Sequence, residues 1–372
     1  MEISRERLVQ TFTELVAIDS PSFGERRMAD HLKAQLAALG IPCEEDDTGG
    51  RIGGSAGNLY ARLDGDESLA PLLFCAHMDT VEPSSGKRAV LGGDGRIESA
   101  GNTVLGADDC AGIAAILEAL RAIREQRLPC RPIEVLFTVA EEVYCRGAAQ
   151  FDFSRIRARE AYVLDLSAPM GTAACQAPTI LSFTAIVHGK ASHAGFAPDH
   201  GVHAIRAAAD AVAKLPHGRI GEDTTLNVGV IGGGLAANII PDTCTLEGEI
   251  RSFVHGKALA LAGTVRQQVE TSAAALGGTV TFSSRVNVQA YETPPEHPVM
   301  ARYARACGAQ GLPFVPTRTF GGSDNNVFAQ HGIAGAVVAS AMHACHSDRE
   351  YTTVDELVSA AALTLRLMTD RG

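Results

Sequence analysis

Three clusters of acidic and histidine side chains could bind divalent cations. Each cluster directly follows an apolar run: His77-Met78-Asp79 follows 72–76, Glu141-Glu142 follows 133–140, and Asp165 follows 161–164. Carboxylates and imidazoles gathered where water is excluded need a compensating cation, because burying an unpaired charge is costly. The clusters therefore predict a metal site.

The apolar runs predict how these side chains meet. A short, continuous apolar run is typical of a strand buried on both faces, as in a parallel sheet. In open α/β sheets, ligands bind just beyond the carboxyl ends of the strands. We therefore expect three strands to deliver the clusters to one edge of a sheet.

The types and spacing of the clustered residues indicate their roles. A metal-bound imidazole usually donates its other N–H to an acceptor such as a carboxylate, and Asp79 is well spaced to accept from His77. A chance histidine near an aspartate is the simpler alternative. Adjacent carboxylates such as Glu141 and Glu142 repel each other unless a cation or proton intervenes. One could bind metal while the other acts as general base toward a metal-bound water. The alternative, a solvated loop start, fits poorly after so apolar a run.

Two further candidates are ambiguous from the residues alone. Asp108-Asp109 lies between Gly106 and Gly112 at a predicted helix start, where acidic residues are common for electrostatic reasons. His346 lies in the segment MHACHSDREY, where a histidine is usually a surface residue, and His343 competes with it for any role.

Composition narrows the class of protein. The chain has 372 residues, enough for two domains, and a net charge of −11, which argues against a nucleic-acid-binding surface. No apolar stretch suits a membrane span or a secretion signal. Its nine cysteines include no CxxC pair, so we expect no disulfide framework and a reducing, cytoplasmic location.

The order of predicted elements indicates a divided catalytic domain. Strands and helices alternate up to about residue 178, including a helix over 111–125, which predicts an α/β fold with a mostly parallel sheet. Strands with polar alternation and two helices then follow, typical of a sheet covered on one face. The α/β pattern resumes after Pro294-Pro295. We therefore expect a catalytic domain formed by 1–178 and 292–372, with an α+β domain inserted at 179–291.

Together these segments resemble the peptidase T-like (tripeptide aminopeptidase-like) members of the di-zinc exopeptidase family. That family also includes acetylornithine deacetylase, succinyl-diaminopimelate desuccinylase, aminoacylase and glutamate carboxypeptidase. The resemblance covers nearly the whole chain and rests on the order of its motifs: HMDTVEP, GADDCAG, AEE, VLD, SHAG, NIIPD, GEIRS, GGSDNN and CHSDREY. It implies a three-layer, zinc-exopeptidase-like catalytic domain with an inserted α+β lid or dimerisation domain.

The resemblance also assigns the metal site. It implies two divalent ions, expected to be zinc, although cobalt or manganese would suit the same ligands. It places Glu141 as the general base, Asp79 behind His77, and a cis peptide bond between Asp108 and Asp109. The implied ligands are His77, Asp108 and Asp165 for the first ion, and Asp108, Glu142 and His346 for the second, with Asp108 bridging.

The inserted domain carries three of the expected substrate contacts, and Gly322 and Ser323 lie in the second part of the catalytic domain. By resemblance, His193 reaches an active site, often that of a partner subunit, and helps to stabilise the oxyanion. Asn238 and Arg251 match positions that hold the substrate backbone or carboxylate, although Arg251 could equally be a surface strand residue. Gly322 and Ser323 complete the expected substrate-binding set. A homodimer formed through the inserted domain is expected.

The third ligand of the first metal distinguishes branches of the family. It is aspartate in aminopeptidases and dipeptidases but glutamate in carboxypeptidases and deacylases, so Asp165 favours a substrate with a free amino terminus. Two departures stand out: Cys110 replaces a lysine of many relatives, and Phe320, with Arg318 nearby, replaces an arginine of peptidase T. The second departure puts strict tripeptide specificity in question.

The expected function is therefore metal-dependent hydrolysis of short peptides with a free N-terminus. A water bridging the two ions would attack the scissile carbonyl, and Glu141 would take its proton. One alternative is an N-acyl-amino-acid deacylase of the same fold. Another is a non-catalytic peptide-binding protein, which the presence of all five expected ligands and Glu141 disfavours.

Overall fold

The computed structural model describes residues 2–371 and divides the chain into two compact units. The first unit consists of Met1–Gln176, Glu292–Thr319 and Ser323–Gly372, and the inserted unit consists of Ala177–Tyr291 and Phe320–Gly322. The sequence placed all of 292–372 in the catalytic domain, which is wrong for Phe320–Gly322. Arg251 Nη1 donates a hydrogen bond to the main-chain oxygen of Phe320 (2.6 Å), and the Phe320 ring lies 4.6 Å from that of Phe253, so this segment packs with the inserted unit.

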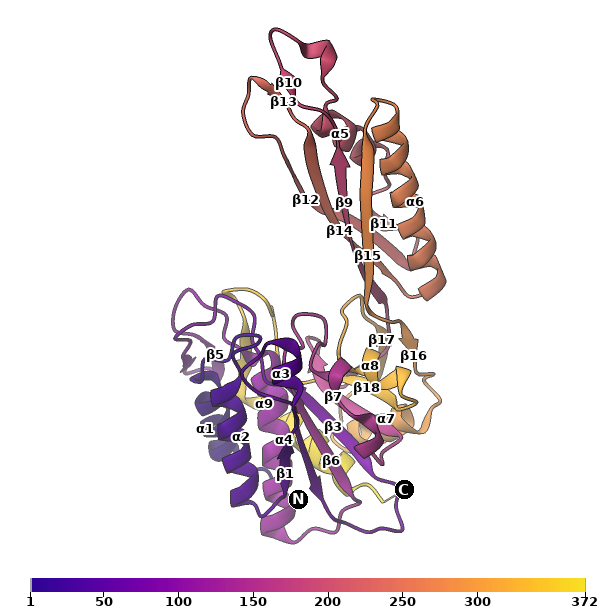
Figure 1. Cartoon of the computed structure of the whole chain (residues 1–372). Helices are drawn as coiled ribbons and strands as arrows, with labels where there is room; N and C mark the ends of the chain where they lie inside the picture. Colours follow the sequence, from indigo (N-terminus) through magenta and orange to yellow (C-terminus); the bar gives the residue numbers. More distant parts are fainter. Residues whose placement is uncertain (1, 372) are drawn as a thin grey trace. The chain divides into compact units, whose positions relative to one another are not determined.

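A nine-stranded sheet forms the centre of the first unit (Figure 1). Its order is β1-β2-β6-β3-β7-β18-β8-β16, with β17 paired to β8. The strands are β1 (Cys43–Glu45), β2 (Leu59–Leu63), β3 (Leu72–His77), β6 (Ile133–Thr138), β7 (Glu160–Leu166), β8 (Thr172–Ala177), β16 (Tyr291–Glu292), β17 (Val315–Arg318) and β18 (Ala334–Ala339). The neighbours β6, β3, β7 and β18 run parallel, and every residue of β3 and β6 is buried, which confirms the prediction from their apolar runs.

Helices cover both faces of this sheet. They are α1 (Arg5–Val16), α2 (Arg26–Ala38), α3 (Thr48–Ile52), α4 (Ala107–Gln126), α7 (Pro298–Gly308), α8 (Asp324–Gln330) and α9 (Val354–Thr369). On one face, α1, α7 and α9 pack with α4, directly or through one another, and the hydroxyl of Tyr162 donates to the main-chain oxygen of Val299 in α7. On the other face, Cys75 Sγ donates to Asp324 of α8. Cys75 pairs with Val163, the residue after Tyr162, and successive residues of a strand point to opposite faces, so the two contacts lie on opposite sides of the sheet. The predicted three-layer arrangement is therefore confirmed.

A small three-stranded sheet in the first unit was not predicted. It has the order β19-β5-β4, formed by β4 (Ala89–Leu91), β5 (Arg96–Ser99) and β19 (Tyr351–Thr353). The Arg96 guanidinium lies 3.5 Å above the Tyr351 ring, a cation–π contact that joins β5 to β19. Short 3₁₀ helices occur at Ala148–Gln150 and Phe153–Arg155.

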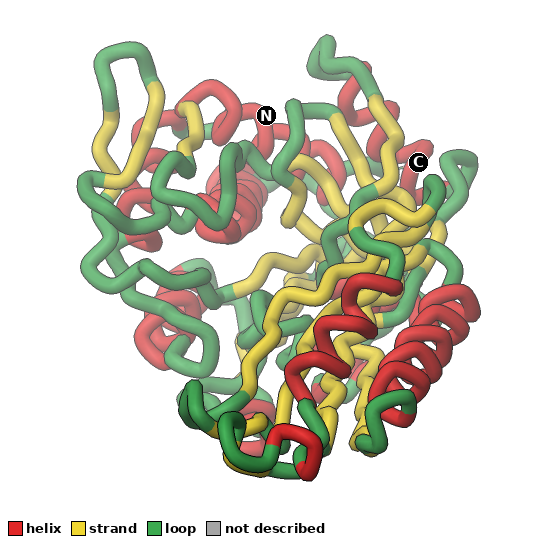
Figure 2. The backbone as a smooth tube through the Cα atoms, turned by 90° about the horizontal axis from the view of Figure 1, so that it is seen from above, coloured by secondary structure: helices red, strands yellow, loops and turns green. Residues whose placement is uncertain are grey.

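The inserted unit is an α+β domain built on an antiparallel sheet of order β11-β12-β14-β9-β15. Its strands are β9 (Thr179–His188), β11 (Gly218–Ile220), β12 (Thr224–Gly233), β14 (Thr243–Ser252) and β15 (Thr279–Val288), and β10 (Ser192–His193) pairs with β13 (Ile239–Ile240). Helices α5 (Ala204–Lys214) and α6 (His255–Ala274) lie side by side against the strands (Figure 2). Burial alternates along β9, which confirms the predicted one-sided covering.

Two expectations from composition can be compared with the structure. None of the helices within residues 2–371 combines the length and apolarity needed to cross a membrane. All nine cysteines lie in this described part of the chain, and none of them forms a disulfide there. The expectation of a chain without a disulfide framework is therefore confirmed.

Candidate metal centre

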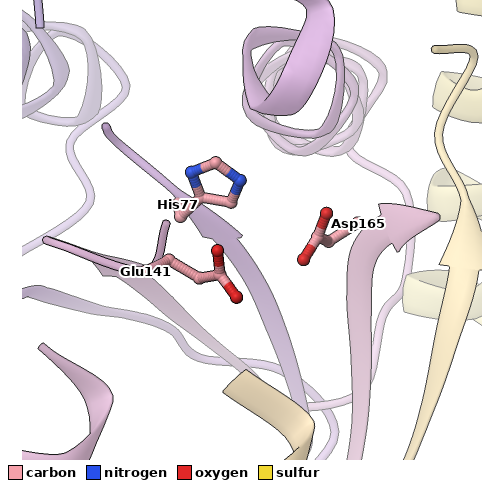
Figure 3. Close-up of side chains that lie close together, drawn as sticks. All are labelled: His77, Glu141 and Asp165. Carbon is pink, nitrogen blue, oxygen red and sulfur yellow. The ribbon is translucent and has the colours of Figure 1, made fainter. Parts of the chain in front are cut away.

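The carboxyl ends of three neighbouring strands bring the predicted clusters together. His77 is the last residue of β3, Asp165 lies near the end of β7, and Glu141 follows β6 after a short loop. The strands are adjacent in the order β6-β3-β7, so these side chains meet at one edge of the sheet and point toward a common space (Figure 3). Their nearest ligand atoms all lie within 4.8 Å of one another.

Asp108 is placed by a distorted start of α4. Gly106 adopts a left-handed conformation (φ 78°), and Asp108 and Asp109 have non-helical backbone angles and are joined by a cis peptide bond, as the family resemblance predicted. Asp108 Oδ1 lies 2.9 Å from His77 Nε2. Asp109 instead has a structural role, because its Oδ2 accepts a hydrogen bond from the main-chain N–H of His77 (3.2 Å) and its Oδ1 accepts one from Gly112 (3.1 Å).

His346, rather than His343, reaches the site. It lies in the loop between β18 and β19, and its Nε2 lies 3.2 Å from Asp108 Oδ2 and 3.1 Å from Glu142 Oε2. His343 Nε2 lies 2.8 Å from Glu356 Oε2, and its ring stacks on a neighbouring tyrosine. Those contacts occupy His343 away from the acidic cluster.

The acidic groups form two overlapping sets around His77. One set is His77, Glu141 and Asp165, and the other is His77, Asp108 and Glu142. The family resemblance paired Asp108, not Glu141, with His77 and Asp165. In the structure, Glu141 lies with His77 and Asp165. A general base would need such a position to reach a water at the metal site.

Burial and crowding shape the electrostatics of the carboxyl groups. The side chains of Glu141 and Asp165 have pKa values well above their usual range, because burial disfavours the charged form and because each lies near other acidic groups. Protons or cations must therefore compensate this cluster, since several unpaired carboxylates cannot be ionised together in a buried site.

The pKa values of the two histidine rings are raised by the same surplus of negative charge. Hydrogen bonds to Asp108 and Glu142 raise the pKa of His346 to about 10. Burial alone would lower the pKa of His77, but the carboxylates of Asp108 and Asp79 outweigh burial and hold it well above its usual value. Protonated rings are the cations that these carboxylates attract when no metal is bound.

The donor set fits divalent metal ions. Within residues 2–371, Glu142 Oε1 is buried with no hydrogen-bond partner, so one ligand atom is left for another group. Mixed imidazole nitrogen and carboxylate oxygen donors suit Zn²⁺ and also Co²⁺ or Mn²⁺. His77, Asp108, Glu142, Asp165 and His346 are the residues that would hold such ions.

Asp79 supports both His77 and the glutamate pair. His77 Nδ1 lies 2.9 Å from the main-chain oxygen of Asp79 and 3.5 Å from its Oδ1, so the ring donates to the main chain and leaves Nε2 for a metal. The Asp79 carboxylate accepts hydrogen bonds from the main-chain N–H groups of Glu141 (2.9 Å) and Glu142 (3.1 Å) and from the Ser22 hydroxyl (2.7 Å). The sequence predicted the Asp79 carboxylate as the acceptor for His77, but the main-chain oxygen of Asp79 is the nearer acceptor, and the carboxylate holds the backbone of Glu141 and Glu142.

His193 and Asn238 lie next to each other in the inserted unit. His193 pairs with Ile239 between β10 and β13, and the main-chain oxygen of Asn238 accepts a hydrogen bond from Ala194 (2.9 Å). His193 is exposed, and its Nδ1 accepts hydrogen bonds from the main-chain N–H groups of Gly195 and Phe196, each at 3.1 Å. An accepting Nδ1 means that the neutral ring carries its proton on Nε2, which is therefore a hydrogen-bond donor.

The other predicted substrate contacts have structural partners. Arg251 Nε lies 2.6 Å from Glu249 Oε1, and its Nη1 donates to the main chain of Phe320. Gly322 belongs to the inserted unit, whereas Ser323 is buried and begins α8, with its N–H donating to Asn326 Oδ1 (3.0 Å). A substrate role for these residues stays a prediction.

Three buried polar residues around the site were missed from the sequence. Glu25, Asn58 and Glu350 accept hydrogen bonds from main-chain N–H groups of the segments that carry the predicted ligands. Of the three, only Glu350 could have been proposed as a site residue from the sequence, because it lies four residues beyond His346 in the same motif. Nothing in the local sequence distinguishes Glu25 or Asn58 from ordinary residues at a helix start or strand start.

Comparisons with known proteins agree with this architecture. The family profile of the peptidase dimerisation domain matches residues 177–275, and that of peptidase family M28 matches residues 58–173. An uncharacterised protein of Bacillus subtilis, YqjE, is 35% identical over 366 residues, which span 98% of each chain.

Two solved structures are similar over almost their full length. A tripeptidase from Staphylococcus aureus has a TM-score of 0.95 with 32% identity, and the aminopeptidase PepT from Bacillus cereus has a TM-score of 0.91 with 37% identity. Each match covers 99% of this chain and 98% of the other. The chain therefore belongs to the peptidase T-like (tripeptide aminopeptidase-like) branch of the di-zinc exopeptidase family, a family of metal-dependent exopeptidases.

Proposed function

We propose that this metal-dependent exopeptidase is an aminopeptidase that acts on short peptides with a free N-terminus. The observation that carries the proposal is the group formed by His77, Glu141 and Asp165 at the sheet edge, with aspartate as its last member. The family resemblance implies that aspartate, rather than glutamate, occupies this position in aminopeptidases. The similarity to a tripeptidase and to the aminopeptidase PepT supports the same substrate class.

Two divalent ions, expected to be zinc, complete the proposed site. His77, Asp108 and Asp165 would hold one ion, and Asp108, Glu142 and His346 would hold the other. When bound, the ions would supply Lewis acidity that polarises the scissile carbonyl and makes water a stronger nucleophile at neutral pH.

Glu141 is the proposed general base. It takes a proton from the attacking water and passes it to the leaving amine, which restores the carboxylate for the next cycle. Its main-chain N–H is held by Asp79, and its Oε1 accepts a hydrogen bond from Cys145 Sγ (3.3 Å). These contacts fix the carboxylate before substrate arrives, so little reorganisation is needed during the reaction.

Most of the proposed substrate-binding residues belong to the inserted unit, whereas Ser323 belongs to the first unit. His193 would donate its Nε2 proton to the developing oxyanion, and Asn238 and Arg251 would hold the peptide backbone or a carboxylate, with Gly322 and Ser323 completing the set. Arg suits a carboxylate because its guanidinium can donate to both oxygens. The Glu249 partner would have to release part of the Arg251 side chain for this contact to form.

A matched panel of substrates tests the proposal. Free dipeptides and tripeptides and their N-acetylated counterparts are incubated with metal-loaded protein, with and without a chelator. We expect cleavage of the free peptides only, abolished by the chelator. Cleavage of only the acetylated substrates would overturn the aminopeptidase proposal in favour of a deacylase, and tight binding without turnover would indicate a non-catalytic protein.

We also propose a homodimer formed through the inserted unit. The match to a peptidase dimerisation domain supports it, and so do exposed apolar residues of this unit: Val230, Ile231, Leu235 and Ile239. Light scattering coupled to size exclusion should give twice the mass of one chain, and a monomer at micromolar concentration would contradict the proposal.

The nine unpaired cysteines support the expected cytoplasmic location.

A further inference from the structure

The main-chain N–H groups of four consecutive residues, 139–142, each donate a hydrogen bond to a side chain. The accepting side chains come from three distant segments of the chain. Val139 donates to Asn58 Oδ1 (3.1 Å) and Ala140 donates to Glu25 Oε1 (3.0 Å). Asp79 accepts the next two, as described above. This set of contacts fixes the direction in which both glutamate side chains leave the backbone.

The Glu25 contact holds a residue whose backbone conformation is unusual. Ala140 has a left-handed backbone conformation (φ 53°), which a residue with a Cβ rarely adopts unless its surroundings hold it there. Glu25 is fully buried, and the same Oε1 atom also accepts a hydrogen bond from the N–H of Phe23 (2.8 Å). One oxygen therefore joins the start of α2 to the residue that immediately precedes Glu141.

Glu350 makes an equivalent contact on the other side of the site. It is 2% exposed, its Oε1 accepts a hydrogen bond from the N–H of Asp108 (2.9 Å), and its Oε2 accepts one from Gly106 (2.7 Å). Glu350 lies in the same loop as His346. It therefore ties the loop that carries one predicted ligand to the backbone of another.

We propose that Glu25 and Glu350 are positioning residues of the metal centre: Glu25 orients the Glu141–Glu142 pair, and Glu350 couples Asp108 to His346. The inference rests on the proposed function. Neither residue touches the reacting atoms, and each acts only through main-chain N–H groups. Residues that orient metal ligands in this way typically change metal affinity or activity by about 10- to 100-fold when they are removed.

The two glutamates use their oxygens differently, which allows a sharp test. Glu25 uses only Oε1, and its Oε2 has no hydrogen-bond partner within residues 2–371. Glutamine at position 25 can therefore keep both contacts with its single oxygen. Glu350 uses both oxygens, so glutamine there would place an NH₂ group against a main-chain N–H and must lose one contact.

The experiment compares Glu25→Gln, Glu25→Ala, Glu350→Gln and Glu350→Ala. Metal affinity is measured by competition with a chromophoric chelator, and kcat and KM are measured at saturating metal. We expect Glu25→Gln to stay within about threefold of the wild type in affinity and kcat, and the other three variants to lose about 10- to 100-fold. KM should change little, because neither residue contacts substrate.

Glu134→Gln and Glu134→Ala are the matched controls. Glu134 is also a buried glutamate of the first unit whose carboxylate accepts main-chain N–H groups, those of Arg157 and Ala158, but it lies near the start of β6 rather than at its end. Its variants should lower thermal stability without changing metal affinity or kcat.

Three results would overturn the inference. They are wild-type metal affinity and kcat in folded Glu25→Ala and Glu350→Ala, equal loss in the two glutamine variants, and equal loss in the Glu134 controls. Failure of the proposed function would look different. In that case the wild-type protein would bind metal, the variants would weaken binding in the predicted order, and no peptide would be hydrolysed.

Discussion

Asp108 Oδ2 lies 3.2 Å from His346 Nε2, although the inserted unit separates these residues in the sequence. The other oxygen of the same carboxylate lies 2.9 Å from His77 Nε2. One carboxylate therefore faces two imidazole rings that come from different parts of the chain. This is the arrangement expected of a ligand shared by two metal ions.

The shared position of Asp108 predicts unequal effects of removing ligands. Asp108→Ala should abolish high-affinity binding of both ions, because each site loses a ligand, whereas His346→Ala or Asp165→Ala should weaken one site. Elemental analysis after dialysis against metal-free buffer should give close to two ions per chain for the wild type. Asp108→Ala that retains two ions would contradict the bridging role.

The adjacent glutamates should be separable by function. Glu141→Gln should lower kcat by about 10²- to 10⁴-fold, the usual contribution of general acid–base catalysis, while metal content stays at the wild-type level. Glu142→Gln should instead weaken metal binding, and added metal should restore part of its activity. Parallel measurements of metal content and kcat check both variants, and a fully active Glu141→Gln would exclude Glu141 as the base.

Much of the site could be predicted from the sequence because an apolar run that stops at a polar residue marks where a buried strand ends. The apolar runs before His77, Glu141 and Asp165 predicted buried parallel strands, and parallel strands place their carboxyl ends at one edge. The choice of His346 over His343 did not follow from local pattern. It depended on family resemblance, since both histidines lie in a loop whose path is set by distant packing.

The hydrogen bonds that Glu25 and Asn58 make to the main chain could not be predicted either, because they also depend on how distant segments pack. Glu25 and Asn58 act on the main chain of Val139 and Ala140, and main-chain N–H groups leave no residue-specific mark in the sequence. The placement of Phe320 in the inserted unit was also missed, because it depends on an arginine contact to a main-chain oxygen. Contacts to the backbone between distant segments appear only in the folded chain.

Metal ions should stabilise the first unit. The buried carboxylates repel one another without cations, and each ion that binds only the folded state adds about 3–4 kcal/mol at 100–1,000 times its Kd. Metal addition should therefore raise the melting temperature of metal-free protein by at least about 5 °C. Differential scanning calorimetry checks this.

Removing one of these carboxylates should change that response. Metal-free Asp165→Asn should melt at or above the temperature of metal-free wild type, because one source of repulsion is gone, but it should gain less from added metal. A variant that responds to metal as strongly as the wild type would indicate that Asp165 is not a ligand.

His193 should affect catalysis without affecting metal binding. Its Nδ1 accepts hydrogen bonds from Gly195 and Phe196, which leaves an Nε2 donor for an oxyanion. Loss of one oxyanion donor typically costs about 10²- to 10³-fold in kcat. His193→Ala should show that loss with unchanged metal content and thermal stability, whereas His217→Ala, another exposed histidine of the inserted unit, should be fully active.

Glu25 should make stability depend on pH. Burial and the nearby charge of Asp79 raise the pKa of Glu25 from 4.5 to about 7. The folded protein therefore holds this proton to higher pH than the unfolded chain does. The resulting contribution to stability is complete below about pH 4.5 and is lost as pH rises through about 7.

Glu25→Gln removes this titration and isolates its effect. Between pH 5 and pH 8, the unfolding free energy of metal-free wild type should fall by about 2–3 kcal/mol relative to that of the variant. Urea denaturation of both proteins at the two pH values measures the difference. Metal-free protein is required because bound cations would neutralise the charge of Asp79 and its neighbours. A gap between the two proteins that is the same at both pH values would show that Glu25 is ionised throughout, so its buried carboxylate would need a cation partner in the folded state.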